Sequence, residues 1–441
     1  MILLQYQTPV PKDIPLALPM AEWLLVTLLI VSFLFHILFV NLMVGGSIVT
    51  LWAQIRGLKD KEYDIFAHEI AKTITVNKSI AVVLGVAPLL SINALYALYF
   101  YSANALTGSI WIMIIPLVTV AFLLTYLHKY TWEYLENNKK LHIGIIGISV
   151  GIFLFIPLIF LTNVNLMMFP EKWEGVKGFF SAMTLPNVWP RYFEFLAGCV
   201  AITGVFIYGY NRRKAYRVEE IYVGFSRYKL KRLGYTIAAS GFAVQIVTGI
   251  IVLFTLPSKG VGYGVIAVMG SAGILLVLAL WWVTDSLTKG PVGIDLHFGK
   301  VVTAVALFLV AYGGSRQMYR HNALDKHQQL VKQHTEEYQK HSLAARTAPK
   351  EEPVIDESTG EFAKGETIFK NNCAACHMKD QALVGPAITE MIDIYKDDPE
   401  GMKKWIKAPG KKRANMTQMP GFPGMSDGDL SELTHYILNF Q

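Results

Sequence analysis

Charged residues are scarce in this chain of 441 residues: Asp, Glu, Lys and Arg make up only 17%, whereas 53% of the residues are hydrophobic. This balance excludes an ordinary soluble globular chain and is typical of a protein that crosses a membrane several times. Cysteine is also rare, with three residues, so we expect no disulfide framework. The first 19 residues lack a basic segment and a small-residue cleavage site, which predicts that no signal peptide is removed.

Eight apolar segments each approach or exceed the ~20 residues that cross a bilayer as a helix. The first would be about 50 Å long at ~1.5 Å per residue, so we expect it to tilt, protrude or bend near Gly45 and Gly46. The sequence thus predicts an all-α polytopic bundle of about eight spans over residues 1–314. The expected spans are 20–54, 79–101, 108–128, 141–163, 190–210, 234–256, 261–284 and 297–313.

Basic residues are distributed unequally between the two sets of loops. Eighteen Lys and Arg residues, Lys78 among them, lie in or beside the connections between the first and second, third and fourth, fifth and sixth, and seventh and eighth segments, against five on the opposite side. The positive-inside rule then predicts that the N-terminus and everything after residue 314 lie outside. Because the net charge of +7 is explained by these loops, we expect membrane lipid and no nucleic acid as a partner.

The composition changes after residue 314. Residues 315–358 are polar, begin with a segment rich in Gln, His, Lys and Glu, and end in a stretch with two prolines and several acids, which is typical of a stalk and linker. A small soluble helical domain is expected over residues 359–441.

The pentapeptide Cys-Ala-Ala-Cys-His at 373–377 carries the strongest chemical signal. Two thiols at this spacing add to the vinyl groups of a haem, and the adjacent histidine supplies an iron ligand. A zinc site would need a second Cys/His pair, and only His435 remains downstream. A thioredoxin-like pair would need a β-α-β surround, which the sequence does not predict. We expect one covalent haem c, attached at Cys373 and Cys376 and ligated by His377.

The second iron ligand should be a methionine or histidine further along, where Met416, Met419 and Met425 compete. Met419 is followed by Pro420, whose fixed backbone suits a loop that holds a sulfur in place.

This part of the chain resembles a class I cytochrome c. The matching segments are KGETIFKNNCAACH (364–377), GPAI (385–388) and QMPGFPGMSDGDLSELTHYIL (418–438), which are similar to the haem-motif helix, the loop beneath the haem, and the methionine loop with the last helix. The resemblance implies His377 and Met419 as the axial ligands. Ser426 is the expected N-cap of the last helix, with Asp429 at the third following position.

The segment FHILFVNLMVGGSI (35–48) resembles the first helix of subunit I of the cytochrome bd-type quinol oxidases. In that family a histidine precedes a glycine by some nine residues, and His36 keeps this interval. The segments VNKSIAVVLGVAPLL (76–90) and RYFEFLAGCVAITGVF (191–206) are similar to the family's second and fifth helices. The resemblance covers residues 1–210 and implies a b-type haem with His36 as its candidate iron ligand.

The chain departs from that family at three places, one of which is the short turn at 257–260 where the family has a quinol-binding loop after its sixth helix. Glu194 and Phe195 stand where the fifth helix carries a haem-ligating histidine, and residues 108–127 contain no acid where the family has paired glutamates. Glu194 is the candidate catalytic residue, as a proton-relay or quinol-site carboxylate; the alternative is an edge carboxylate paired with Arg191. His36 could instead be a packing histidine bonded to a neighbouring carbonyl.

We expect a respiratory electron-transfer subunit in the bacterial inner membrane. Electrons would pass between a membrane carrier, either quinol or b-type haem, and haem c on the periplasmic side. One alternative is a subunit of a bd-like terminal oxidase that reduces oxygen; another is a redox-inert anchor for a cytochrome c. Other membrane subunits and periplasmic cytochromes are the expected partners, with haem c, haem b and a quinone as the cofactors considered.

Overall fold

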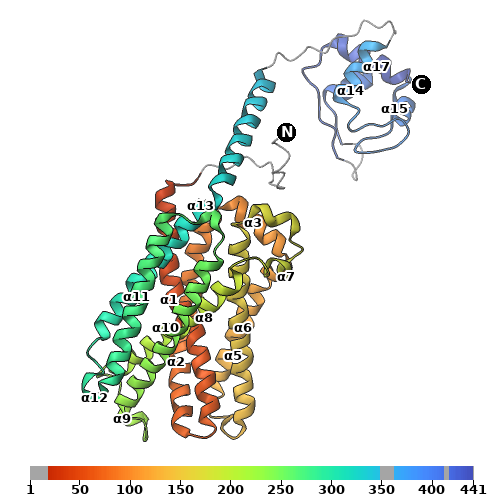
Figure 1. Ribbon diagram of the computed structural model, residues 1–441. Coiled ribbons are helices and arrows are strands. Elements are labelled where there is room, and N and C mark those ends of the chain that lie inside the picture. The colour runs from red at the N-terminus through yellow and green to blue at the C-terminus, as the bar shows by residue number, and fades with distance from the viewer. Residues whose placement is uncertain (1–17, 348–361, 412–416, 441) are drawn as a thin grey trace. The chain divides into compact units, whose positions relative to one another are not determined.

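The computed structural model describes residues 18–347, 362–411 and 417–440. The chain divides into two compact units, Met1–Ser342 and Leu343–Gln441. The described residues form helices and no strand (Figure 1), which confirms the predicted all-α class.

Among the described residues, eight helices are long and apolar enough to cross a membrane, the number predicted from the sequence. They are α1 (Glu22–Gly57), α2 (Lys61–Leu95), α4 (Ser109–Ile112) with α5 (Ile114–Tyr130), η1 (Glu136–Asn138) with α6 (Lys139–Leu166), α8 (Val188–Arg212), α10 (Arg227–Thr255), α11 (Tyr263–Thr288) and α13 (Phe298–Thr347). The connections contain α3 (Ala97–Thr107), η2 (Pro170–Gly175), α7 (Phe179–Ala182), α9 (Val218–Ile221), η3 (Ser258–Gly260) and α12 (Gly290–Gly293).

The first two helices form a long hairpin (Figure 1). With 36 residues, α1 is about 54 Å long, which exceeds a hydrocarbon core of ~30 Å. Its partner α2 has 35 residues, so both helices are longer than an untilted crossing requires. No break in α1 occurs at Gly45, where the sequence had suggested a bend. Gly45 instead lies against the carbonyl of Cys199 in α8, where a Cβ atom would collide.

Helices α8 and α10 approach each other closely because small residues face one another along the contact. A Cβ atom at position 204 would collide with Ala238, and one at position 234 would stand 2.7 Å from the backbone nitrogen of Tyr208. A Cβ atom at Gly241 would likewise collide with Ala201. In a membrane, where lipid is as apolar as the helices, such small-residue contacts provide much of the packing energy.

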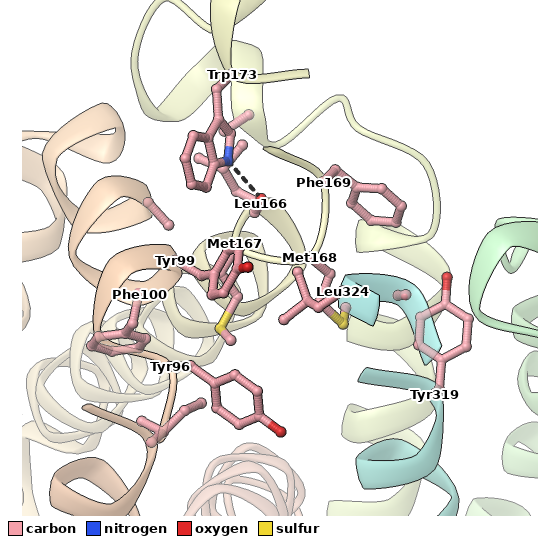
Figure 2. Packing of buried hydrophobic residues seen from close by; sticks show 14 of the residues in the cluster. Tyr96, Tyr99, Phe100, Leu166, Met167, Met168, Phe169, Trp173, Tyr319 and Leu324 are labelled. Atoms are coloured by element: carbon pink, nitrogen blue, oxygen red, sulfur yellow. Dashed lines mark hydrogen bonds between the residues drawn. The ribbon is translucent and has the colours of Figure 1, made fainter. Parts of the chain in front are cut away.

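A cluster of buried hydrophobic side chains closes the end of the bundle at which α1 begins and α2 ends. Figure 2 shows that Tyr96, Tyr99 and Phe100 lie opposite residues from the segment after α6 and from α13. The indole nitrogen of Trp173 donates to the carbonyl of Leu166 across 3.0 Å, as the dashed line marks. This end corresponds to the outer face expected from the loop charges.

Helix α13 continues without interruption past residue 314, where the sequence had suggested the start of a polar stalk. Ser315, Tyr319 and Leu324 on this continuation are buried in the closing cluster or beside it. Further along the helix, the Nδ1 atom of His327 lies 3.1 Å from the hydroxyl of Tyr99. From residue 328 onward most described side chains are exposed. Apolar packing of α13 therefore extends about three turns beyond the predicted boundary.

The second unit contains α14 (Ala363–Asn372), α15 (Ile388–Tyr395), α16 (Pro399–Lys407) and α17 (Asp427–Leu438). Its first and last helices cross closely because Gly365 leaves room for the carbonyl of Glu432. Ser426 is the N-cap of α17, and its hydroxyl accepts from the backbone nitrogen of Asp429 at 3.1 Å and donates to the Asp429 carboxylate at 2.7 Å. The predicted cap is therefore confirmed.

Candidate functional site

The Cys-Ala-Ala-Cys-His segment begins where α14 ends. The chain continues in a turn in which the backbone nitrogens of Cys376 and His377 both donate to the carbonyl of Cys373 at 3.0 Å. Cys373 and His377 are each 8% exposed, whereas Cys376 is half-buried. One short turn thus brings two thiols and an imidazole together at the edge of the domain core, as haem attachment requires.

The imidazole of His377 is fixed by the loop that follows it. Its Nδ1–H donates to the carbonyl of Pro386 at 2.8 Å. Gly385 lies against the ring, and a Cβ atom there would stand 2.8 Å from both ring nitrogens. A proton held at Nδ1 leaves the Nε2 lone pair available to a metal, the arrangement in which a carbonyl orients a histidine ligand.

The donor set fits a haem better than the two alternatives. Burial raises the pKa of Cys373 to about 11, with a smaller contribution from Cys376. A thioredoxin-like pair needs a lowered thiol pKa, and these thiols form no disulfide. In the described part of the chain, no group of three or more His, Cys, Asp or Glu side chains is arranged to hold a metal ion. The downstream histidine considered for a zinc site, His435, packs against the ring of Phe362, with the two ring centroids 5.0 Å apart.

The methionine loop is anchored to α16. The backbone nitrogen of Phe422 donates to the carbonyl of Ile406 at 3.0 Å, and the Gln418 amide donates to Pro409 at 3.1 Å. Met419 and Met425 are both half-buried against the domain core, whereas Met416 lies outside the described residues. The choice of Met419 as a ligand stays a prediction.

These features define a membrane-type helical bundle joined to a small helical domain that can hold a covalent haem. Residues 362–441 match the cytochrome c family. The same part is 30% identical over 78 residues to cytochrome c6 of Cyanidioschyzon merolae, covering 18% of this chain and 73% of that protein. It is 28% identical over 75 residues to cytochrome c6 of Cyanidium caldarium, covering 17% and 67%. Through this domain the chain belongs to the cytochrome c family, and it binds haem c covalently and transfers electrons through it.

In the first unit, His36 of α1 faces α2. Its Nδ1–H donates to the carbonyl of Ala81 at 2.8 Å, and Gly85 lies against its ring, where a Cβ atom would be 2.8 Å from Cε1. The side chain is half-buried. The carbonyl contact expected of a packing histidine is thus present. Because this hydrogen bond uses Nδ1, it does not engage Nε2.

Glu194 is only 5% exposed and lies on α8. Its Oε2 atom accepts a hydrogen bond from the hydroxyl of Tyr312 in α13 at 2.9 Å. Arg191 is close enough to attract the carboxylate, but no ion pair within 4.0 Å joins them in the described structure. The observed partner of Glu194 is therefore a tyrosine that the sequence had not suggested.

Lys78 had been counted among the loop charges, and that assignment is wrong. The residue is fully buried within α2. Its ammonium group donates to the carbonyl of Phe122 at 3.1 Å and to the hydroxyl of Thr125, and it lies 3.3 Å from the ring centroid of Tyr126. Without Lys78 the count is seventeen against five, so the charge asymmetry between the two sets of loops persists.

A second polar group that sequence reasoning missed joins α1, α5 and α6. His128 donates from Nε2 to the Gln54 side-chain oxygen at 3.0 Å, and the Gln54 amide donates to Nδ1 of His142 at 2.6 Å. His142 in turn donates from Nε2 to the His128 carbonyl at 2.7 Å. Each ring has one consistent tautomer, so these buried groups satisfy one another and lock three helices together.

Proposed function

We propose that the chain is a membrane-bound electron-transfer subunit in which His36 ligates a b-type haem that exchanges electrons with haem c. One observation carries the proposal. His36 has the same surroundings as His377: in each, a backbone carbonyl 2.8 Å away holds Nδ1–H, and a glycine lies against the ring. Such an arrangement orients Nε2 towards a metal.

Each histidine would then have a defined task. His377 and Met419 would hold the haem c iron from both sides, with Cys373 and Cys376 as the covalent attachments. His36 would hold the membrane haem, as the resemblance of residues 1–210 to the bd-type family implies. A haem with both axial positions filled supplies one-electron outer-sphere transfer.

Glu194 supports a role at the membrane carrier. The buried Glu194 carboxylate accepts a hydrogen bond from Tyr312. A proton can move between these two groups when a quinol is oxidised. The quinol itself would be the source of electrons and protons. Reduction of oxygen in the manner of a bd-like oxidase is the rival function, and it would require further ligands from a second subunit.

The loop charges support an inner-membrane location with the N-terminus and the haem c domain on the periplasmic side. Haem c is attached to proteins on the periplasmic side of the bacterial membrane. This gives independent support for the orientation inferred from the loop charges. Periplasmic cytochromes and further membrane subunits are the proposed partners, within a respiratory chain.

The test is a pyridine haemochrome spectrum of the purified full chain, produced in a host that attaches haem c. Wild type, His36→Ala and the exposed control His321→Ala are compared. We expect haem c in all three and haem b in wild type and the control only.

Haem c alone in the wild type would overturn the b-haem proposal and favour the anchor. An additional d-type band would favour the oxidase. Retention of haem b in His36→Ala would keep a membrane haem but exclude His36 as its ligand.

A further inference from the structure

Three arginines converge at the outer end of the first unit. Arg191 lies near the start of α8, and Arg316 and Arg320 lie one turn apart on α13. Their charges lie close enough to repel one another: Arg316 acts on both Arg191 and Arg320. Arg320 is only 8% exposed, and the other two are half-buried.

Aromatic rings surround the three guanidinium groups. The Cζ atom of Arg191 lies 5.5 Å from the ring centroid of Tyr319, and that of Arg320 lies 5.3 Å from the centroid of Tyr96. Figure 2 shows these two tyrosines in the closing cluster. Arg316 lies 5.2 Å from the centroid of Phe33 on α1. Aromatic faces attract a cation but do not neutralise it.

The cluster lacks counter-charge. Among the described residues no carboxylate forms an ion pair with any of the three arginines. Glu194 is an acid within the described residues whose charge acts on Arg191 and Arg316, and its Oε2 atom is already engaged by Tyr312. Glu171, on the loop after α6, is paired with Lys259 at 2.8 Å. Three cations thus face one carboxylate in an apolar setting, which is costly unless an anion joins them.

One donor is left without any partner. Arg320 donates from Nη1 to the Gln317 side chain at 2.8 Å, but its buried Nε–H has no hydrogen-bond partner in the described structure. A buried N–H without an acceptor loses the hydrogen bond that it would make with water, so a bound acceptor would stabilise it. Guanidinium groups match the geometry of phosphates and carboxylates, to which they donate two parallel bonds.

We propose that Arg191, Arg316 and Arg320 form a binding site for the anionic group of a membrane-embedded ligand, a phosphate or a carboxylate. Two ligands present this chemistry at the required depth. One is an acidic phospholipid, through its headgroup phosphate, and the other is a haem, through its peripheral carboxylates. The phospholipid alternative does not depend on a haem at His36, whereas the haem alternative rests on the proposed function.

The experiment uses the full chain in nanodiscs of phosphatidylcholine, with or without phosphatidylglycerol. The thermal midpoint and the ratio of haem b to haem c are measured for wild type, Arg316→Gln, Arg320→Gln and Arg213→Gln. The last variant is the matched control, because Arg213 also lies over a tyrosine ring, 4.0 Å from its centroid, but is exposed.

A midpoint that phosphatidylglycerol raises in wild type and control, but not in the two cluster variants, identifies a phospholipid ligand. A haem b content that falls in the cluster variants alone identifies haem carboxylates. Because a charge-assisted hydrogen bond is worth ~1.5–3 kcal/mol, apparent affinity should fall about tenfold or more. If all four proteins respond alike in both measurements, the proposal is overturned.

Arg316→Lys guards against failure of the glutamine variants to fold. It keeps the charge but loses the planar fork, so we expect an intermediate loss of binding. Native mass spectrometry of the wild type provides a second check, and a protein that retains neither anionic lipid nor haem b would also overturn the site.

Discussion

The ring of His36 in α1 lies directly against Gly85 in α2: a Cβ atom at position 85 would stand 2.8 Å from Cε1 and 3.1 Å from Nδ1 of the imidazole. Gly85→Ala should therefore displace the ring from the Ala81 carbonyl without touching the ring chemically. We expect the variant to lose the proposed haem b as His36→Ala does, measured by the haemochrome ratio.

Gly144→Ala is the control for this prediction, because nothing lies within 4 Å of a Cβ atom at that helical position in α6. If Gly85→Ala lowers the thermal midpoint but keeps the same haem content as the wild type, His36 serves packing alone.

Gly385→Ala should destabilise the cytochrome c domain. The new methyl group would collide with the His377 ring, which is held by Pro386, so either the ring or the loop must shift. Overpacking of this kind costs ~1–3 kcal/mol, which in a domain of this size lowers the thermal midpoint by several degrees. Unfolding followed by haem c absorbance measures the effect. Gly424→Ala, with open space around its Cβ position, should melt like wild type.

Lys78 and Thr125 should be energetically coupled. Thr125→Val removes an acceptor from a buried ammonium group, which should cost ~1–3 kcal/mol of unfolding free energy. In a Lys78→Met background the same change should cost much less, because no buried charge then needs the hydroxyl. A double-mutant cycle of thermal or denaturant unfolding measures the coupling. Equal losses in both backgrounds would show that the two side chains act independently.

The stability of the cytochrome c domain should depend on Asp429 in acid. The hydrogen bond from Ser426, and then that from Lys364, lower the pKa of Asp429 below its ordinary value of 3.8. A depressed carboxylate pKa contributes stability that is fully present above 3.8 and is lost as the pH falls through the folded value. Asp429→Asn should therefore flatten the acid limb of the thermal midpoint against pH.

The exposed Asp393→Asn removes the same formal charge elsewhere in the domain and should leave the acid limb in place. Ser426→Ala, which removes the cap, should lower stability by about 1 kcal/mol near neutral pH. An unchanged acid limb in Asp429→Asn would mean that another group governs the transition.

Features that depend on short stretches of chain could be predicted from the sequence. The Cys373–His377 turn, the Ser426 cap and the eight apolar helices each follow from residues within a few turns of one another. The family of the C-terminal domain could be recognised for the same reason.

Features that depend on which helices face each other could not be predicted. Lys78 lies among polar residues at the edge of an apolar segment and therefore resembles a loop charge, until α5 supplies its acceptors. Gln54 gives no signal by itself, because its partners lie 74 and 88 residues away. Arg316 and Arg320 belong by composition to a solvated stalk, and only the continued packing of α13 brings them into the bundle.

The unbroken course of α13 has a mechanical consequence. Its 50 residues form a single hydrogen-bonded rod of about 75 Å that carries Tyr312, Arg316 and Arg320 on its packed half. Each residue advances a helix by about 100°. The direction in which a side chain beyond His327 points is therefore fixed relative to the side chains inside the bundle. Deleting one residue there would turn the end of the rod by about 100°, whereas deleting seven would nearly restore its facing. Side chains between His327 and Ser342 therefore keep a fixed angular relation to Tyr312, Arg316 and Arg320 within one continuous helix.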